Sequence, residues 1–171
     1  MKKSQSSNRH RARELAAQLL YSLFTRPDQD IAECLDVFTS EDGFAFEESS
    51  EVKKYLAFLA EGVWSRRFEI DDMMRRTVTG WRPERMVAVD RVVLQMAIFE
   101  GFLGKTAPLS VAISEAIELA CAFGTEDSGK FVNGVLGKLA RSIDGGDKPS
   151  AESVPRGDDN AVAPSETSAD R

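Results

Sequence analysis

The residues at 1–13 form a strongly basic stretch at the start of the sequence, and no aspartate or glutamate interrupts it. Its basic residues are Lys2, Lys3, Arg9, His10, Arg11 and Arg13. Arg9 and Arg13 lie four residues apart, which places both side chains on one face of a helix. Free backbone N–H groups at a helix start also favour anions. The stretch is therefore a candidate contact for nucleic-acid phosphates, and a solvated terminus that aids solubility is the alternative.

The stretch GKFVNGVLGK at 129–138 holds a second group of residues suited to binding. At helical spacing, one stripe carries Lys130, Asn133, Gly137 and Arg141. Phe131 lies beside this stripe. Single-stranded RNA suits such a surface, because its bases stack on aromatic rings and form hydrogen bonds to amides. The structural alternative places Phe131 in the core and uses the glycines of this stretch for close helix packing.

Two adjacent charges, Asp90 and Arg91, interrupt a segment at 84–102 that is otherwise apolar on nearly every side. Such a helix belongs in the middle of a bundle. The two charges form either an ion pair with a neighbouring helix or a charged patch on which a protein partner docks. The sequence alone leaves both readings open.

Catalytic and metal-binding patterns are missing from the sequence, so we expect no enzyme and no metal centre. His10 is the single histidine, and neither paired cysteines nor a phosphate-binding loop is present. Cys34 and Cys121 are expected to be buried, reduced thiols. The acidic pairs Glu41-Asp42, Glu47-Glu48 and Asp71-Asp72 are read as solvated faces. The net charge of −6 excludes a wholly basic nucleic-acid binder.

Helices must position these residues, because almost every ordered stretch repeats its apolar residues with the helical period. The sequence predicts an all-α fold of about seven helices, with a break near Arg67 in the third segment. The expected segments are 9–25, 30–38, 51–79, 84–102, 108–123 and 126–143. Phe44 and Phe46 are expected to pin an intervening polar loop to the core. Residues 145–171 are rich in Gly, Pro, Ser, Asp and Ala, which predicts a disordered acidic tail. With neither a long apolar run nor a signal peptide, we expect a cytoplasmic protein without membrane contact.

Four segments taken together resemble the bacterial transcription antitermination factor NusB family. They are RHRARELAAQLLYSL, DRVVLQMAIFE, VAISEAIELACAFG and EDSGKFVNGVLGKL, and they cover residues 9 to about 143 in the family's order. The resemblance implies two three-helix subdomains that share a core. The chain is thus expected to divide into a flexible basic N-terminus at 1–8, a helical RNA-binding domain at 9–144 that carries the resemblance, and the tail at 145–171, which has no counterpart in the family.

The function implied by this resemblance is transcription antitermination without enzymatic activity or a cofactor. The family protein pairs with ribosomal protein NusE of the small ribosomal subunit, and the pair binds boxA RNA in nascent ribosomal RNA. It then supports RNA polymerase together with NusA and NusG. A homodimer is also found among family members, and the sequence leaves the oligomeric state open. The alternative function is a helical adaptor that binds proteins and makes no direct RNA contact.

The resemblance also assigns roles to individual residues. The RNA-facing residues carried over by position are Arg9, His10, Arg11, Arg13, Asp127, Ser128, Lys130, Phe131 and Asn133. The partner-facing residues are Tyr21, Asp90, Arg91 and Leu94. His10 and Gln95 stand where the family often has arginine, so this chain departs from the family at one RNA-facing position and on the central helix.

Overall fold

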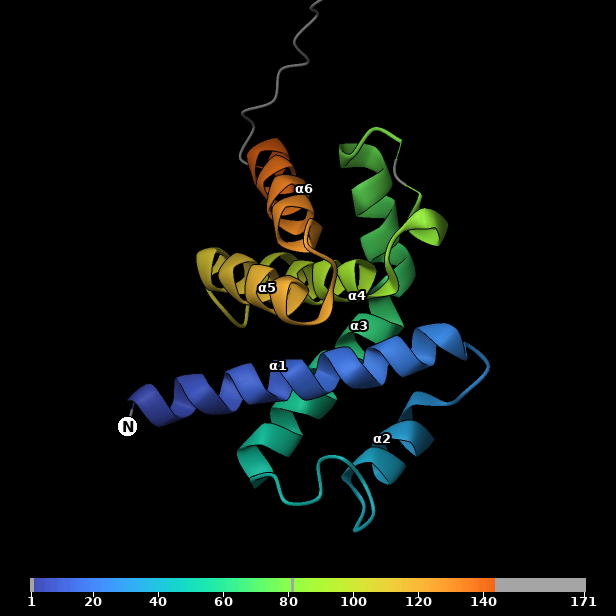
Figure 1. The fold of residues 1–171 in the computed structure, drawn as a ribbon, viewed down its shortest axis with the longest axis vertical. Coiled ribbons are helices and arrows are strands. Elements are labelled where there is room, and N and C mark those ends of the chain that lie inside the picture. The colour runs from blue at the N-terminus through green and yellow to red at the C-terminus, as the bar shows by residue number, and fades with distance from the viewer. Residues whose placement is uncertain (1, 81, 144–171) are drawn as a thin grey trace, which may run out of the picture.

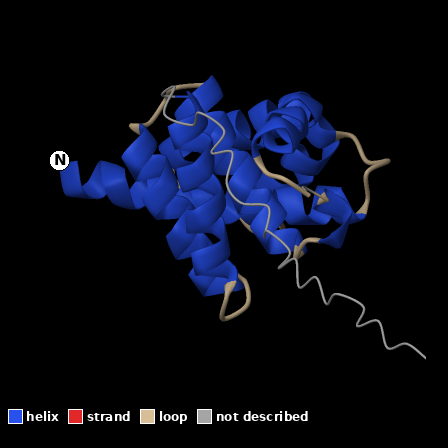
Figure 2. Ribbon diagram, turned by 90° about the horizontal axis from the view of Figure 1, so that it is seen from above, coloured by secondary structure: helices blue, strands red, loops and turns tan. Residues whose placement is uncertain are grey.

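The computed structural model describes residues 2–80 and 82–143, and every regular element in these two ranges is helical (Figures 1 and 2). The elements are α1 (Lys2–Thr25), α2 (Ile31–Thr39), α3 (Ser50–Thr77), the 3-10 helix η1 (Pro83–Arg85), α4 (Ala88–Ala97), the π-helical segment η2 (Ile98–Leu103), α5 (Leu109–Phe123) and α6 (Ser128–Ile143). The predicted all-α class is confirmed. The tail predicted at 145–171 lies outside the described residues.

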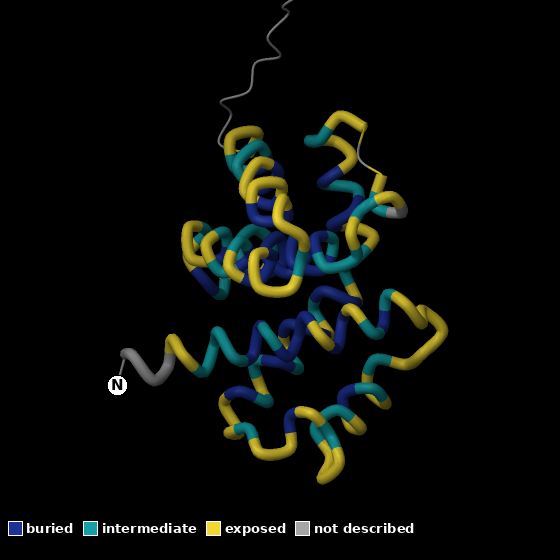
Figure 3. The backbone as a smooth tube through the Cα atoms, viewed as in Figure 1, coloured by how far each residue is buried: buried dark blue, intermediate teal, exposed yellow. Residues whose placement is uncertain are grey.

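The helices form two groups that are joined by α3 (Figure 1). One group contains α1, α2 and the first half of α3, and the other contains the second half of α3 with α4, α5 and α6. Buried residues line the inner faces of both groups (Figure 3). Large side chains with almost no exposed surface come from every α-helix except α2, and include Leu15, Leu59, Leu94, Leu119 and Leu136. The two groups therefore share one core.

The helix α3 is unbroken over Ser50–Thr77, so the break predicted near Arg67 is wrong. The buried stripe continues past that point, because Val63, Ile70 and Met74 have no exposed surface. Arg67 lies outside the core, with its guanidinium 4.3 Å from the centre of the Trp64 ring. Length alone motivated the predicted break, while the apolar period runs through the helix without interruption.

The boundaries of two other elements also differ from the predicted ones. The helix α1 begins at Lys2, so residues 2–8, assigned to a flexible N-terminus, form its first turns. The segment predicted as one helix at 84–102 contains η1, α4 and η2. The wider turn of η2 holds Glu100, which is 2% exposed, where it faces α1. Inserted π-helical turns of this kind often mark functional or strained positions.

The loop at 40–49 is held against α2 by a buried alanine and by a contact between the rings of Phe44 and Phe38, whose centres lie 5.5 Å apart. Ala45 has no exposed surface, and its N–H donates to the carbonyl oxygen of Phe38 over 2.9 Å. Phe44 is 80% exposed and Phe46 47% exposed, so the prediction that they pin the loop to the core is wrong. The loop also approaches α2 closely at Gly43, where an added Cβ would lie 2.3 Å from the carbonyl oxygen of Phe38.

Candidate nucleic-acid interface

The first cationic surface lies in the first half of α1, two turns after its start, where Arg9 is fixed by its neighbours. Its Nη1 donates to the carbonyl oxygen of Thr106 over 3.2 Å, and its guanidinium lies 5.0 Å from the centre of the Tyr55 ring. Cation–π contacts of this length hold an arginine in place while leaving its charge available. Arg9 is half-buried, so part of its guanidinium still meets solvent.

Two lysines that carry no signal in the sequence lie beside Arg9. Lys54 lines a surface hollow with Arg9, and Lys105 directly precedes Thr106, which accepts the hydrogen bond from Arg9. Both lysines are exposed, and neither is ion-paired within the described ranges. We call Arg9, Lys54 and Lys105 the α1 cluster. No sequence spacing relates these three residues, because they come from α1, α3 and the loop before α5.

His10 and Arg11 are engaged by carboxylates, which reduces the charge they offer to a phosphate. The Nδ1 of His10 lies 2.7 Å from a carboxylate oxygen of Glu115. Arg11 donates from Nε to Glu48 over 2.7 Å and from Nη1 to Glu14 over 3.0 Å. These two hydrogen bonds raise the pKa of the Arg11 guanidinium above its ordinary value. The His10 side chain is nevertheless 38% exposed and the Arg11 side chain 43% exposed.

Arg13 is a buried structural cation and not a surface residue. Its side chain is 3% exposed and forms a two-pronged ion pair with Glu100, with distances of 2.9 and 2.5 Å. The Tyr55 hydroxyl also donates to Glu100. Burial opposes the charge on Arg13, but the hydrogen bonds and the charge of Glu100, with help from Glu115, raise its pKa. Direct RNA contact, expected for Arg13, is incompatible with this position.

One possible cation site involves His10. Ligand atoms of His10, Glu115 and Glu118 lie within 4.8 Å of one another. Glu115 is already used twice, since it meets His10 at 2.7 Å and the Nη1 of Arg13 at 3.3 Å. These contacts engage the Glu115 carboxylate without a metal ion, so the cluster is explained as an ion-pair network.

Ser128, one of the expected RNA contacts, has a structural role at the start of α6. Ser128 is 1% exposed, and its Oγ accepts the backbone N–H of Thr125 over 2.8 Å. A side chain at Gly124 would place its Cβ only 2.4 Å from that Oγ, so the glycine makes room for the turn. Ser128 therefore shapes the helix start, while the neighbouring Asp127 is exposed.

The exposed side of α6 carries the second cationic surface. Lys130, Phe131 and Asn133 are all exposed, and the Phe131 side chain is 41% exposed. The opposite side of α6 is buried through Val132, Val135 and Leu136. The alternative that places Phe131 in the core is therefore wrong. Phe131 is an aromatic ring held at the surface by a helix whose other face is anchored in the core.

Two arginines from the α3–α4 connection lie beside Phe131, and neither stands out in the sequence. Arg82 and Arg85 line one surface hollow together with Phe131. Gly80, which also lines this hollow, has a φ of +75°, a left-handed conformation that other residues rarely adopt. We call Lys130, Phe131, Asn133, Arg82 and Arg85 the α6 cluster. Its parts are distant in sequence, so only the fold brings them together.

The three glycines of the stretch at 129–138 have different surroundings. A Cβ at Gly129 would lie 2.4 Å from the Sγ of Cys121, so this glycine permits the contact between α5 and α6. A Cβ added at Gly134 would meet no atom within 4 Å, and one at Gly137 would lie 3.4 Å from its nearest neighbour, Arg141. Packing explains Gly129 alone. Cys121, expected to be buried, is exposed, whereas Cys34 is half-buried.

The helix α5 lies between α1 and α6 in the view of Figure 1. Its Glu115 contacts His10 and Arg13 on α1, and its Cys121 lies against Gly129 on α6. Within the described ranges no hydrogen bond or ion pair joins the α1 cluster to the α6 cluster directly. A ligand that used both surfaces would have to extend past α5.

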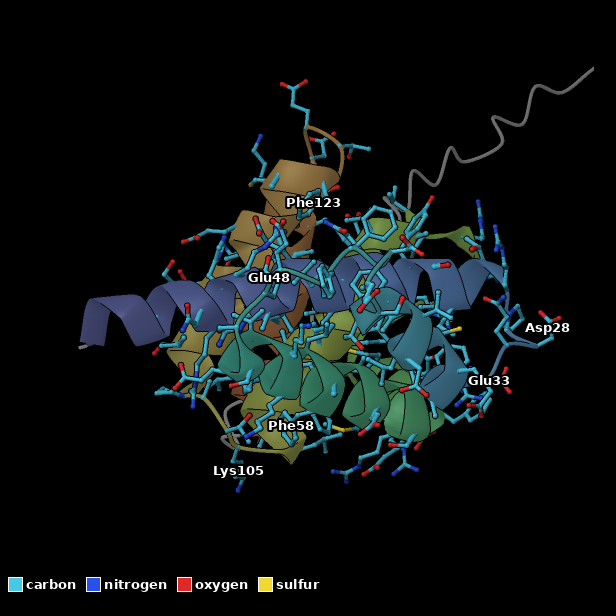
Figure 4. All side chains as sticks on the ribbon, turned by 90° about the horizontal axis from the view of Figure 1, so that it is seen from below. Asp28, Glu33, Glu48, Phe58, Lys105 and Phe123 are labelled. Carbon is cyan, nitrogen blue, oxygen red and sulfur yellow. The ribbon has the colours of Figure 1, made fainter. Side chains whose placement is uncertain are left out.

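A separate hollow surrounds Tyr21, the first of the expected partner-facing residues. Tyr21 is 44% exposed, and the hollow is completed by apolar side chains of α4 and α5, with Phe123 itself 43% exposed (Figure 4). Asp90 directly follows Val89, which lines the hollow, and is 5% exposed. One carboxylate oxygen of Asp90 is buried and accepts no hydrogen bond from the described residues. Such an oxygen is costly unless a partner supplies a donor.

Of the other expected partner-facing residues, Arg91 is half-buried in an ion pair and Leu94 is fully buried. Arg91 donates from Nη2 to Asp71 over 2.8 Å, and Gln95 donates to the other oxygen of Asp71 over 2.9 Å. Asp71 is 3% exposed, so the reading of that acidic pair as a solvated face is wrong at this position. The ion-pair reading of Arg91 is the one the structure supports. Leu94 has no exposed surface, so it cannot contact a partner directly.

The fold and these surfaces define a helical protein that presents cations, an aromatic ring and an apolar hollow to other molecules. The chain belongs to the NusB family, since the family's sequence model matches residues 10–141. It is 40% identical over 141 residues to the transcription antitermination protein NusB of Symbiobacterium thermophilum, covering 81% of this chain and 92% of that protein. It is likewise 40% identical over 143 residues to NusB of Desulforapulum autotrophicum, covering 82% and 98%.

Solved structures agree with this assignment. The structure of T. maritima NusB matches with a TM-score of 0.68 and 34% identity, covering 78% of this chain and 90% of that one. A crystal structure of the antitermination factors NusB and NusE in complex with double-stranded RNA matches in fold, with a TM-score of 0.70, 22% identity, and coverage of 80% and 98%. The family consists of non-enzymatic transcription antitermination factors, which confirms that expectation. Within the described residues, no helix combines the length and apolar character needed to span a membrane.

Proposed function

We propose that this protein binds the boxA RNA of nascent ribosomal RNA together with ribosomal protein NusE, and thereby supports processive transcription of ribosomal RNA operons. The observation that carries the proposal is the α6 cluster. Phe131 is an exposed ring on a well-anchored helix, and Lys130, Asn133, Arg82 and Arg85 surround it. Aromatic rings flanked by cations and amides are a common surface for unpaired RNA bases.

The α1 cluster supports the same function through phosphate binding. Arg9, Lys54 and Lys105 supply three positive charges close to the N-terminal end of α1. Charges of this kind add affinity without reading the base sequence. In this proposal the α6 cluster contacts bases and the α1 cluster holds the backbone of the same RNA. His10 and Arg11 contribute less, because carboxylates already engage them.

The Tyr21 hollow is the proposed contact for NusE. Tyr21 and Phe123 are exposed aromatic rings, a residue type enriched at protein interfaces. Asp90 is 5% exposed and its unpaired oxygen is buried, so in this proposal it supports the hollow from beneath and is not a direct contact. Because the chain carries a net charge of −6, a basic ribosomal protein also compensates the repulsion between this protein and RNA. Action with NusA, NusG and RNA polymerase, in the cytoplasm, belongs to the same proposal.

The decisive experiment measures RNA binding by the complex with NusE. Fluorescence anisotropy with a labelled boxA RNA compares wild type, Phe131→Ala and Phe68→Ala. Phe68 is a matched control, because it is a 71% exposed phenylalanine on α3. Loss of one base stack costs about 1–3 kcal/mol, or roughly fivefold to over a hundredfold in affinity. We expect that loss for Phe131→Ala alone.

The alternative function is a helical adaptor that binds proteins only, and the Tyr21 hollow is the observation in its favour. That function predicts that Phe131→Ala and Arg9→Ala leave RNA affinity and antitermination unchanged, whereas Tyr21→Ala abolishes NusE binding. If the wild-type complex shows no preference for boxA RNA over a scrambled RNA, the adaptor function replaces the proposed one. Sedimentation of the free protein tests the homodimer separately.

A further inference from the structure

The segment at 27–52 is the most acidic part of the described chain and contains no lysine or arginine. Its nine acidic residues are Asp28, Asp30, Glu33, Asp36, Glu41, Asp42, Glu47, Glu48 and Glu51. We call this segment, which comprises α2, its two flanking loops and the first residues of α3, the acidic lobe. Its first part lies at the end of the molecule where α1 finishes, and Asp28 and Glu33 project outwards there (Figure 4).

Structural roles account for three of these carboxylates. Asp30 caps α2 by accepting the N–H groups of Ala32 and Glu33, Glu48 pairs with Arg11, and Glu51 accepts from Asn8. The other six are exposed and have no ion pair within the described ranges; they are Asp28, Glu33, Asp36, Glu41, Asp42 and Glu47. Their mutual repulsion is a cost that fold stability alone does not explain.

Large apolar side chains stand exposed among these carboxylates. Phe44 is 80% exposed and Val37 is 70% exposed, although the backbone around them is firmly held. The N–H of Gly43 donates to the carbonyl oxygen of Ser40 over 2.9 Å, and Ala45 is fully buried. Phe44 is therefore presented by an ordered loop and is not an unanchored side chain.

A groove of about 760 Å³ connects these residues to α1. Its apolar lining includes Leu19, Val37, Phe38 and Phe44. Four acids of the lobe stand among them and outnumber the single basic lining residue, Arg26. Gln18 of α1 lines both this groove and the Tyr21 hollow, so the two surfaces are continuous. An apolar stripe with acidic edges is complementary to an amphipathic helix that carries basic residues beside its apolar face.

We propose that the acidic lobe is a docking surface for a basic amphipathic segment of a partner protein. RNA is repelled by it, because the six free carboxylates carry the same sign as phosphates. The chain's own residues 144–171 are unsuitable, since seven acids there (Asp144, Asp147, Glu152, Asp158, Asp159, Glu166, Asp170) outnumber three basic residues. A second copy placed symmetrically would set one acidic lobe against another.

The test uses the full chain, labelled with ¹⁵N, and a synthetic helical peptide of leucine and lysine with leucines at i, i+3, i+4 and i+7. Two further peptides serve as controls, a scrambled one of the same composition and one with glutamate in place of lysine. We expect amide shifts at 28–46 with the leucine–lysine peptide alone. Affinity should fall roughly tenfold or more for Phe44→Ser and also for the charge variant Glu33→Gln/Asp42→Asn. Phe68→Ser, the matched exposed-phenylalanine control, should bind the peptide like wild type.

Three results overturn the proposal. The first is equal binding of the scrambled peptide, and the second is equal loss of affinity in Phe44→Ser and Phe68→Ser. The third is a wild-type dimer, by light scattering, that Phe44→Ser converts to a monomer, which would make the face a contact between copies. Circular dichroism checks that each variant is folded. Binding of boxA RNA should be unchanged in Phe44→Ser, so this proposal and the proposed function fail independently.

Discussion

Arg13 and Phe131 show at the scale of single residues how surroundings decide whether a side chain can meet a ligand. Arg13 belongs to the same basic stretch as Arg9, yet its guanidinium is enclosed by Glu100 and Glu115. Phe131 belongs to an apolar run, yet its ring lies at the surface. In both cases residue type alone indicates the opposite environment. The partner helices, which are distant in sequence, determine the outcome.

Replacing Arg13 with alanine should destabilise the fold and affect RNA binding only through that loss. The change leaves the Glu100 carboxylate buried without its cation, which typically costs about 3–5 kcal/mol. Urea denaturation measures the free energy of unfolding. RNA affinity of the fraction that remains folded should match wild type. Markedly weaker RNA binding by a variant of normal stability would instead indicate direct contact.

Tyr55 should make stability depend on pH in the alkaline range. Burial and the hydrogen bond to Glu100 raise the pKa of its hydroxyl above 10. Between the unfolded and the folded pKa the unfolded chain loses this proton while the folded protein keeps it, so stability is full below about pH 10 and falls as pH rises. The decline should be shallower in Tyr55→Phe. Urea midpoints at about pH 8 and about pH 10.5, on either side of the ordinary tyrosine pKa, measure the difference, and parallel declines would contradict it.

At the scale of elements, the contact between α5 and α6 depends on one glycine. Gly129→Ala brings a methyl group to about 2.4 Å from the Sγ of Cys121, and overpacking of this kind typically costs about 1–3 kcal/mol. Cys121→Ala removes the obstructing sulfur. The double variant should therefore recover most of the lost stability in thermal denaturation. If the double variant instead loses as much stability as the two single variants added together, the sulfur is not the obstacle.

Gly134 lies further along α6 and should behave in the opposite way. Its Cβ position is open, so Gly134→Ala should stabilise the helix by about 0.5–1 kcal/mol. We expect RNA affinity of the NusE complex to fall, because the methyl group would stand beside Phe131 where RNA approaches. The thermal midpoint and the anisotropy titration measure the two effects. Raised stability with unchanged RNA affinity would mean that RNA does not approach this backbone.

The helical elements could be predicted from the sequence, because apolar residues recur at the helical period and local caps fix the ends. The helix expected at 30–38 is α2 at Ile31–Thr39, and Asp30 caps it from the position before its first residue. The composite surfaces could not be predicted in the same way. Lys54, Lys105, Arg82 and Arg85 carry no local signal, since each joins its cluster through packing between distant segments. The resemblance supplied residues within the matching segments, and these four residues lie outside them.

At the scale of the whole molecule, α3 belongs to both helix groups and should make them unfold together. Buried residues along its length, from Leu56 to Met74, contact the common core. Neither group can lose its packing while α3 stays intact on the other side. Denaturation followed by the NMR signals of α2 and of α6 should give one midpoint, as expected for a two-state domain. Two separate midpoints would show that the groups are independent.

The unpaired acids Asp28 and Glu33 lie beyond the end of α1, whereas the α1 cluster lies in its first half. This arrangement gives the molecule a preferred orientation when it approaches a charged ligand. Arg9 lies 16 residues before Thr25, where α1 ends, or about 24 Å at 1.5 Å per residue, so these opposite charges stand well apart. In the field of a nucleic acid this dipole turns the basic end forwards before any contact forms. The positions of the acids should therefore affect the rate at which the protein encounters a nucleic acid, and not only its affinity.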